Sequence, residues 1–203
     1  MSKPDRSIDP RILTSAKKVF LTHGFQNASL KEICDHAGIT TGALYKRYRG
    51  KEALFNAVVE DTVAALNDFV EQRCALEAGT LSDDALVKAW EMDEKNTLEY
   101  FQFFHEYNDG FILLLTCSEG TAYSNFQHDW VEKMTVKTYE YFLEAQKRGL
   151  THTDISMEEL HILLSAFWTT IYEPFIHGFT WKQMEAHCKI ICGLFNWHQV
   201  LGF

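Results

Sequence analysis

Apolar residues recur every three or four positions along most of the chain, which is the spacing of amphipathic α-helices. In the first third of the sequence, short breaks with helix-capping residues separate these segments. The pattern predicts four helices there, over residues 9–24, 29–38, 40–48 and 51–74. Gly24 should end the first helix, because glycine readily adopts the left-handed conformation that terminates helices. Ser29 and Glu32 form the capping box that should open the second.

The rest of the sequence continues the helical pattern, and we find no convincing strand alternation in it. It predicts helices over residues 82–108, 121–147 and 156–174 and from 180 onward, with a short apolar segment over 111–117. Capping boxes at Ser156–Glu159 and Thr180–Gln183 should open the last two helices. Pro174 should kink or end the first of these two, because proline lacks the N–H that a helix interior needs. We therefore expect an all-α fold of about nine helices.

The formal net charge of −9 is unevenly distributed along the chain. Residues 1–51 contain ten basic and four acidic residues, a net charge of +6, whereas the remainder contains nine basic and 24 acidic residues, a net charge of −15. This asymmetry favours a basic domain over residues 1–50 and a larger acidic domain over 51–203, joined by the helix at 51–74. A solvated acidic surface with a chance basic end would give the same charges.

Cysteine usage and hydropathy predict a cytoplasmic protein without membrane association. The five cysteines are an odd and scattered set, which fits reduced thiols better than disulfides. We see no apolar run of transmembrane length and no apolar segment of a secretory signal. Cys188 and Cys192 lie one helical turn apart beside His187, a spacing that a metal or redox sensor could use. Buried packing is the simpler interpretation, and the sequence indicates neither a cofactor nor a catalytic constellation.

The segment Ser29–Phe55 has the makeup of two short helices around a tight turn. The second helix starts with the small residues Thr40–Gly42 and continues with Tyr45, Lys46 and Arg47. Small residues allow close approach to DNA, and aromatic and basic residues can meet phosphates and base edges. The segment therefore predicts a helix that enters the major groove of DNA.

Residues 9–55 resemble the DNA-binding domain of TetR-family transcriptional regulators. The resemblance rests on the turn Ala37–Ile39, the block TTGALYKRY over Thr40–Tyr48, and the motif KEALF that starts at Lys51. It is strong over about the first quarter of the chain, and the rest matches in length and helix count. It implies a three-helix, helix-turn-helix domain at the N-terminus and a larger helical domain that binds a ligand and dimerises.

Contacts with double-stranded DNA carry over from the family position by position. They fall on eight residues: Lys31, Thr40, Thr41, Gly42, Tyr45, Lys46, Arg47 and Lys51. Arg47 is the candidate for bidentate contact with a guanine, which discriminates against a wrong base by ~1–3 kcal/mol. Lys31 fits an ordinary exposed lysine equally well, and Lys46 fits a contact with phosphate alone.

The resemblance further implies a homodimer through the last two helices, so that two heads read a pseudo-palindromic operator. Two apolar stripes fit this expectation: Leu160, Leu163, Leu164, Phe167, Trp168 and Ile171, and then Met184, Cys188, Ile191, Phe195 and Trp197 or His198. More apolar faces exist here than a small monomer can hide.

A pocket for a small-molecule effector should be aromatic. Its candidate residues are Trp90, Phe101, Phe104, Tyr107, Trp130 and Trp168. Glu99 and Glu106 lie among these aromatics and could hold a lipophilic cation. An amphipathic helix with core aromatics and solvated acids explains the same pattern, and we favour that interpretation.

The sequence thus predicts a DNA-binding transcriptional regulator, a repressor that a small molecule releases, and not an enzyme. In one alternative, the C-terminal domain engages a protein partner in place of a ligand. In another, an enzyme with an aromatic pocket has kept a vestigial head, but the intact basic recognition helix argues against it.

Overall fold

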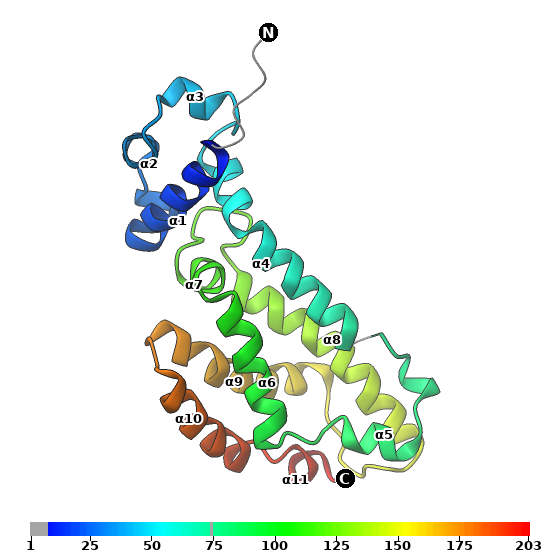
Figure 1. The fold of residues 1–203 in the computed structure, drawn as a ribbon. Coiled ribbons are helices and arrows are strands. Elements are labelled where there is room, and N and C mark those ends of the chain that lie inside the picture. The colour runs from blue at the N-terminus through cyan, green and yellow to red at the C-terminus, as the bar shows by residue number, and fades with distance from the viewer. Residues whose placement is uncertain (1–7, 74) are drawn as a thin grey trace. The chain divides into compact units, whose positions relative to one another are not determined.

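The computed structural model describes residues 8–73 and 75–203, which form helices and connecting turns with no strand among them (Figure 1). The predicted all-α fold is confirmed. The chain divides into two compact units: unit 1 comprises Met1–Leu66 and Tyr107–Phe126, and unit 2 comprises Asn67–Glu106 and Gln127–Phe203. The domain boundary that we expected near residue 50 stays a prediction. Cys74, the expected end of the fourth helix, lies outside the described residues.

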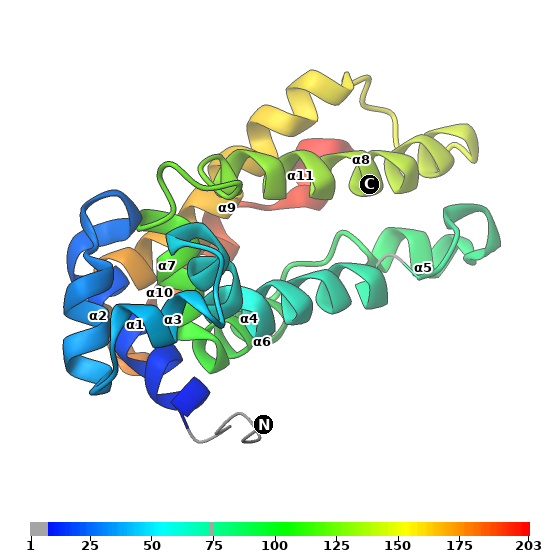
Figure 2. The same cartoon turned by 90° about the horizontal axis from the view of Figure 1, so that it is seen from above.

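Unit 1 is built around the first helix of the chain. Its elements are α1 (Ile8–Asn27), α2 (Leu30–Ala37), α3 (Thr41–Tyr45), the first part of α4 (Lys51–Arg73) and α7 (Asn108–Thr116). Both α2 and α7 pack against α1, and α3 follows α2 after a tight turn (Figure 2). Gly24 breaks α1 with a φ of 69°, as its position in the sequence predicts. The Ser29 hydroxyl caps α2 by accepting the N–H of Glu32.

The third helix is shorter than the expected 40–48. It ends at Tyr45, and the N–H groups of Arg47 and Tyr48 both donate to the Leu44 carbonyl at 2.9 Å. The bond from Tyr48 has the spacing of an α-helix, whereas the bond from Arg47 has the shorter spacing of a 3₁₀ turn. The last turn is therefore tighter than an α-helix, and α3 ends there.

Unit 2 holds the remaining helices. Besides the last part of α4 they are the 3₁₀ helix η1 (Ala78–Thr80), α5 (Asp83–Lys88), α6 (Glu94–Glu106), α8 (Phe126–Lys147) from Gln127 on, α9 (Met157–Ile176), α10 (Trp181–Leu194) and α11 (Trp197–Leu201). Both predicted capping boxes are present at the starts of α9 and α10. Pro174 lies in the last turn of α9, which ends two residues later.

Local polar bonds explain three differences from the expected elements. The helix expected over 82–108 is split into α5 and α6, because the Asp93 carboxylate caps a new start by accepting the N–H of Asn96 at 2.7 Å. Helix α8 starts at Phe126 and not near 121, since the hydroxyls of Thr121 and Ser124 bond to nearby carbonyls. After α10, Asn196 caps the additional helix α11.

Each unit has an aromatic core. In unit 1 the rings of Phe20 and Phe55 meet edge to face with centroids 5.1 Å apart, and Phe25 contacts both. In unit 2 the ring of Trp168 lies 5.4 Å from that of Trp130 and 6.2 Å from that of Phe104. Edge-to-face packing of this kind adds to the stabilisation from burial alone.

Helix α7 approaches α4 closely at Gly110. A Cβ atom at this position would lie 1.9 Å from Thr62 Oγ1, far inside van der Waals contact. We therefore expect Gly110→Ala to lower the free energy of unfolding by about 1–3 kcal/mol, the usual cost of overpacking. Urea unfolding followed by circular dichroism measures this change. Gly79→Ala is the control, because Gly79 has open space around it and should change stability by no more than about 0.5 kcal/mol. Equal stability of the two variants would contradict the described contact.

Candidate nucleic-acid interface

The start of α3 presents its predicted contact residues outward. Thr40, Thr41, Gly42 and Lys46 are exposed, and Tyr45 keeps 57% of its surface accessible. The Thr40 hydroxyl caps the helix by accepting the N–H of Ala43 at 3.2 Å. An outward face made of small, aromatic and basic side chains is suited to the major groove of DNA.

The inward face of α3 is held by one side chain, because Leu44 is completely buried. The preceding turn is fixed by Gly38 at a φ of 64°, and the Ile39 N–H donates to the Cys34 carbonyl at 3.0 Å. On the other side of α2, the Ser15 hydroxyl donates to the Ile33 carbonyl at 2.8 Å. These contacts fix α3 in the helix-turn-helix arrangement.

Arg47 does not project freely from the recognition segment. Its Nε donates to the Asp9 carboxylate at 2.5 Å, its Nη1 donates to the Ala43 carbonyl at 3.3 Å, and only 20% of its side chain is exposed. The pKa of the neighbouring Tyr48 hydroxyl is raised, mainly because the hydroxyl is partly buried and secondly because the negative charge of Asp9 is close to it. The sequence could not indicate the Asp9–Arg47 pair, since 38 positions separate the two residues.

Lys51 has contacts inside unit 1. Its Nζ donates to the carbonyls of Gln26 at 2.8 Å and Ala28 at 3.2 Å, and it lies 4.8 Å from the centre of the Phe25 ring. The ammonium thus closes the loop between α1 and α2. Lys31, in contrast, is an exposed side chain in the first turn of α2.

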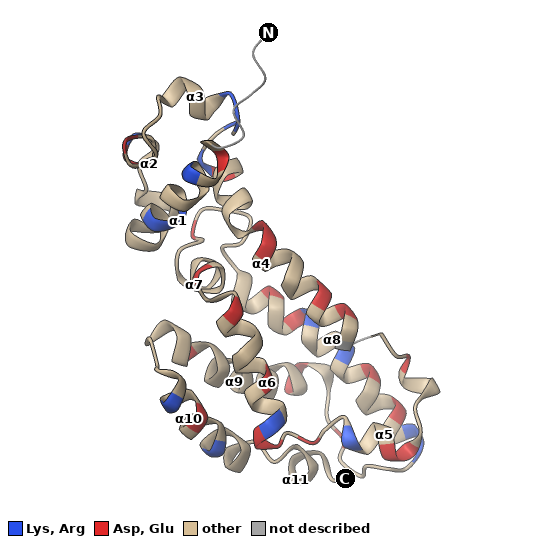
Figure 3. Ribbon diagram, viewed as in Figure 1, with Lys and Arg blue, Asp and Glu red and all other residues tan. Residues whose placement is uncertain are grey.

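In unit 1, Lys and Arg residues lie on α1 and in the segment that follows α3 (Figure 3). Beyond the predicted contacts, Arg11 and Lys18 of α1 lie with His36 of α2 around a shallow surface groove. The Arg11 guanidinium also donates to the Ala37 carbonyl at the end of α2. Positive charge in unit 1 therefore extends beyond the recognition helix.

Most of the predicted pocket residues are packed in the core of unit 2. Phe101, Phe104, Trp130 and Trp168 are at least 95% buried, and Phe104 and Trp130 contact Trp168 through their rings. Tyr107 is not among them, since it precedes α7 in unit 1. The structure therefore does not gather these residues around one cavity.

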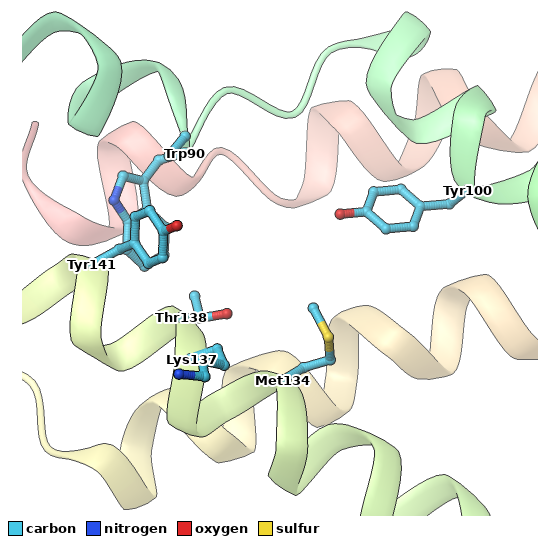
Figure 4. A pocket seen from close by; sticks show the side chains of 7 residues that line it. Trp90, Tyr100, Met134, Lys137, Thr138 and Tyr141 are labelled. Atoms are coloured by element: carbon cyan, nitrogen blue, oxygen red, sulfur yellow. The ribbon is translucent and has the colours of Figure 1, made fainter. Parts of the chain in front are cut away.

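One pocket of unit 2 lies between Trp90 and Tyr100 and has a volume of about 150 Å³ (Figure 4). Among the predicted pocket residues, Trp90 alone lines it; the full lining is Ala89, Trp90, Tyr100, Met134, Lys137, Thr138 and Tyr141. Trp90 and Tyr141 lie together at one end, and the hydroxyl of Tyr100 points inward from the other (Figure 4). The lining contains neither Glu99 nor Glu106, so its charged side chain is the basic Lys137.

Cys188 is buried, and loss of solvation is the main cause that raises the pKa of its thiol to about 11. A thiol with a raised pKa is a poor nucleophile and a poor metal ligand at neutral pH. The Cys192 sulfur lies 3.3 Å from the Thr97 hydroxyl. Among the described residues, no three His, Cys, Asp or Glu side chains gather in a way that could hold a metal ion.

The apolar stripes expected at a dimer interface belong largely to the interior of unit 2. Leu160, Phe167, Ile171 and Ile191 are almost completely buried within the protomer. The outward faces of α9 and α10 carry other apolar residues. Three are about two-thirds exposed, and small exposed residues accompany them: Ile162, Ile190 and Leu194, with Ala166, Ala186 and Gly193.

The fold and the outward face of α3 define a helix-turn-helix protein. The family model for bacterial regulatory proteins of the tetR family matches residues 12–58. Residues 12–58 of the chain are therefore similar to the DNA-binding region of this family. No helix in the described part of the chain is long and apolar enough to cross a membrane.

Known proteins with similar sequences are transcriptional regulators by name. The regulator UidR of Escherichia coli is 42% identical over 62 residues, which are 30% of this chain and 32% of UidR. The chain thus matches only about a third of that relative. The repressor AcnR of Corynebacterium efficiens is 28% identical over 85% of this chain and 82% of its own. The solved structure of SCO3833, a TetR-family member from Streptomyces coelicolor, covers the whole chain and 92% of SCO3833 with a TM-score of 0.60 at 15% identity.

Lys46, directly after α3, and Lys51, at the start of α4, should differ in their effect on stability. We expect Lys51→Gln to lower the free energy of unfolding by about 1–2 kcal/mol, because it leaves the carbonyls of Gln26 and Ala28 without their charged donor. Lys46→Gln is the matched control, and it should change stability by less than about 0.5 kcal/mol because Lys46 is exposed. Chemical unfolding of both variants tests this difference. If both were equally stable, the contacts of Lys51 would be unimportant for the fold.

Proposed function

We propose that this chain is a homodimeric transcriptional regulator that binds double-stranded DNA sequence-specifically, and that it acts as a repressor released by a small molecule. The carrying observation is the exposed row of residues at the start of α3. Its outward face combines Thr40, Thr41 and Gly42 with Tyr45 and Lys46, whereas Leu44 anchors the opposite face. The name of the relative AcnR, a transcriptional repressor, supports the repressor assignment.

In the proposed complex, α3 lies in the major groove. Thr40, Thr41 and Gly42 reach base edges and phosphates at the helix start, while Tyr45 and Lys46 meet the backbone. Lys31 and Lys51 are proposed as further phosphate contacts. For Lys51 this means sharing its ammonium between a phosphate and the carbonyls of the α1–α2 loop.

The proposed dimer forms through the outward faces of α9 and α10. Ile162, Ile190 and Leu194 are each about two-thirds exposed, which is costly in water. The small residues Ala166 and Ala186 would allow close approach of a second copy. A two-fold interface of this kind uses the same surface on both copies and matches a pseudo-palindromic operator.

The proposed effector binds the pocket between Trp90 and Tyr100. Its volume of about 150 Å³ is below the roughly 300–1,000 Å³ of typical ligand pockets, and a cavity of such volume holds a molecule of about one aromatic ring. The effector would release DNA if it bound more tightly to a conformation with low DNA affinity.

The small volume of the pocket between Trp90 and Tyr100 is also the observation that favours a second candidate function. In it, unit 2 engages a protein partner in place of a small molecule, and the chain still binds DNA. Lys137, half-buried on α8 beside this pocket, would then lie at a protein interface.

DNA binding is tested by fluorescence anisotropy with a duplex from upstream of the protein's own gene and with random genomic fragments. We expect Tyr45→Ala and Lys46→Gln to weaken binding to both at least about tenfold. Lys46→Gln should also reduce the slope of log K against log salt by about one, because it loses one phosphate contact. Lys95→Gln is the control, as this exposed lysine lies on α6 in unit 2. If the wild-type protein bound neither kind of fragment, the proposed function would be wrong.

The oligomeric state is tested by sedimentation velocity. We expect the wild-type protein to sediment at twice its 23.5 kDa, and Ile190→Asp to sediment as a monomer because a charge on this face opposes its burial. Leu143→Asp places the same charge on exposed Leu143 of α8 and should stay dimeric. A dimeric Ile190→Asp variant would place the interface elsewhere.

A further inference from the structure

The two basic residues that follow α3, Lys46 and Arg47, are not equally available to DNA. Lys46 is exposed, whereas Arg47 keeps only 20% of its side chain accessible. Its Nε donates to the Asp9 carboxylate at 2.5 Å, and its Nη1 donates to the Ala43 carbonyl at 3.3 Å. The guanidinium thereby joins the first turn of α1 to the backbone of α3.

The ion pair between Asp9 and Arg47 lies next to the exposed Lys46 in the sequence. The stability of the fold depends little on this pair. Asp9 has 44% of its side chain exposed, and its place in the first turn of α1 already favours a negative charge. Ion pairs that water reaches contribute little to stability. Helix α3 is held instead by the burial of Leu44, so the position of α3 does not depend on the Asp9–Arg47 pair. The pair can therefore have a role in DNA binding.

The role of the pair in DNA binding follows from the acceptors that the Arg47 guanidinium can bind. Arg47 can donate to a carboxylate, to a phosphate, or to the O6 and N7 atoms of a guanine. A phosphate is present on every DNA sequence, and a carboxylate that occupies Arg47 competes with it. A guanine offers Arg47 two aligned acceptors, and it does so only where that base stands at the right position of a site.

We propose that Asp9 is a specificity-determining residue that withholds Arg47 from the backbone of non-cognate DNA and yields it only at a cognate site. The proposal rests on the DNA-binding function proposed above. Asp9 acts through Arg47 and is therefore a positioning residue outside the helix-turn-helix segment. It penalises binding to arbitrary sequences without weakening the exposed contacts of Tyr45 and Lys46.

The experiment measures affinity for a random-sequence 30-base-pair duplex at several salt concentrations by fluorescence anisotropy. We expect Asp9→Ala to bind this duplex roughly threefold to tenfold more tightly at low salt. Its slope of log K against log salt should be steeper by about one phosphate contact, because the released Arg47 displaces an additional counterion. Asp9→Glu restores the carboxylate and should restore the wild-type slope.

Two controls separate the release of Arg47 from a simple change in charge. Asp35→Ala removes an exposed acid of α2 in the same unit, and it should leave the slope unchanged. In an Arg47→Ala background, Asp9→Ala should have no more effect than Asp35→Ala. A steeper slope that persists without Arg47, or a slope equal to that of Asp35→Ala, would overturn the proposal.

The proposal can still be tested if the Asp9→Ala variant does not fold. If circular dichroism shows that Asp9→Ala is unfolded, Asp9→Asn replaces it, because asparagine keeps the size of the side chain but lacks the negative charge that pairs with Arg47. Its slope should then be steeper than that of the wild-type protein, and an unchanged slope would overturn the proposal. Failure of the wild-type protein to bind any duplex would refute the DNA-binding function itself, which is a distinguishable result.

Discussion

Helix α3 has only five residues, and a helix of that length is unstable in water without tertiary contacts. Its orientation therefore depends on the burial of Leu44, the side chain that joins it to the core of unit 1. The left-handed Gly38 and the cap at Thr40 determine where the helix starts, but neither determines which face turns outward. Every exposed residue of the recognition segment is positioned relative to this one anchor.

A second consequence of the short helix concerns the cations beyond it. Because α3 ends at Tyr45, Arg47 lies in the turn that follows it and Lys51 begins α4. The side chains of both residues reach other parts of unit 1. One contacts the Asp9 carboxylate and the other contacts backbone carbonyls. Positive charge in a sequence motif is therefore not a measure of positive charge available to DNA.

The sequence was informative where a structure depends on neighbouring residues. Caps such as Ser29 and Ser156, and the break at Gly24, follow from local hydrogen bonding and backbone conformation, so they could be predicted. The cap at Asp93 could have been found too, since an acidic residue three positions before Asn96 is a recognisable helix start.

Features that depend on distant residues were not accessible in this way. Helical periodicity shows that one side of α9 is buried, but not whether the same chain or a second copy covers it. For this reason Phe167 and Ile171 were expected at an interface and are found in the core, whereas the exposed Ile162 was not singled out. Similarly, aromatic composition could not distinguish the packed Trp168 from Trp90 at the cavity.

Unit 1 is assembled from two segments that are far apart in the chain, and this bears on how the protein is synthesised. Helix α7 joins α1 through an ion pair between Lys17 and Asp109 at 3.4 Å and through the N–H of Phe25, which donates to the Cys117 carbonyl at 2.8 Å. These partners leave the ribosome long after α1 to α3 have been made. The first helices to emerge during translation must therefore wait for these partners until the segment ending at Phe126 has followed.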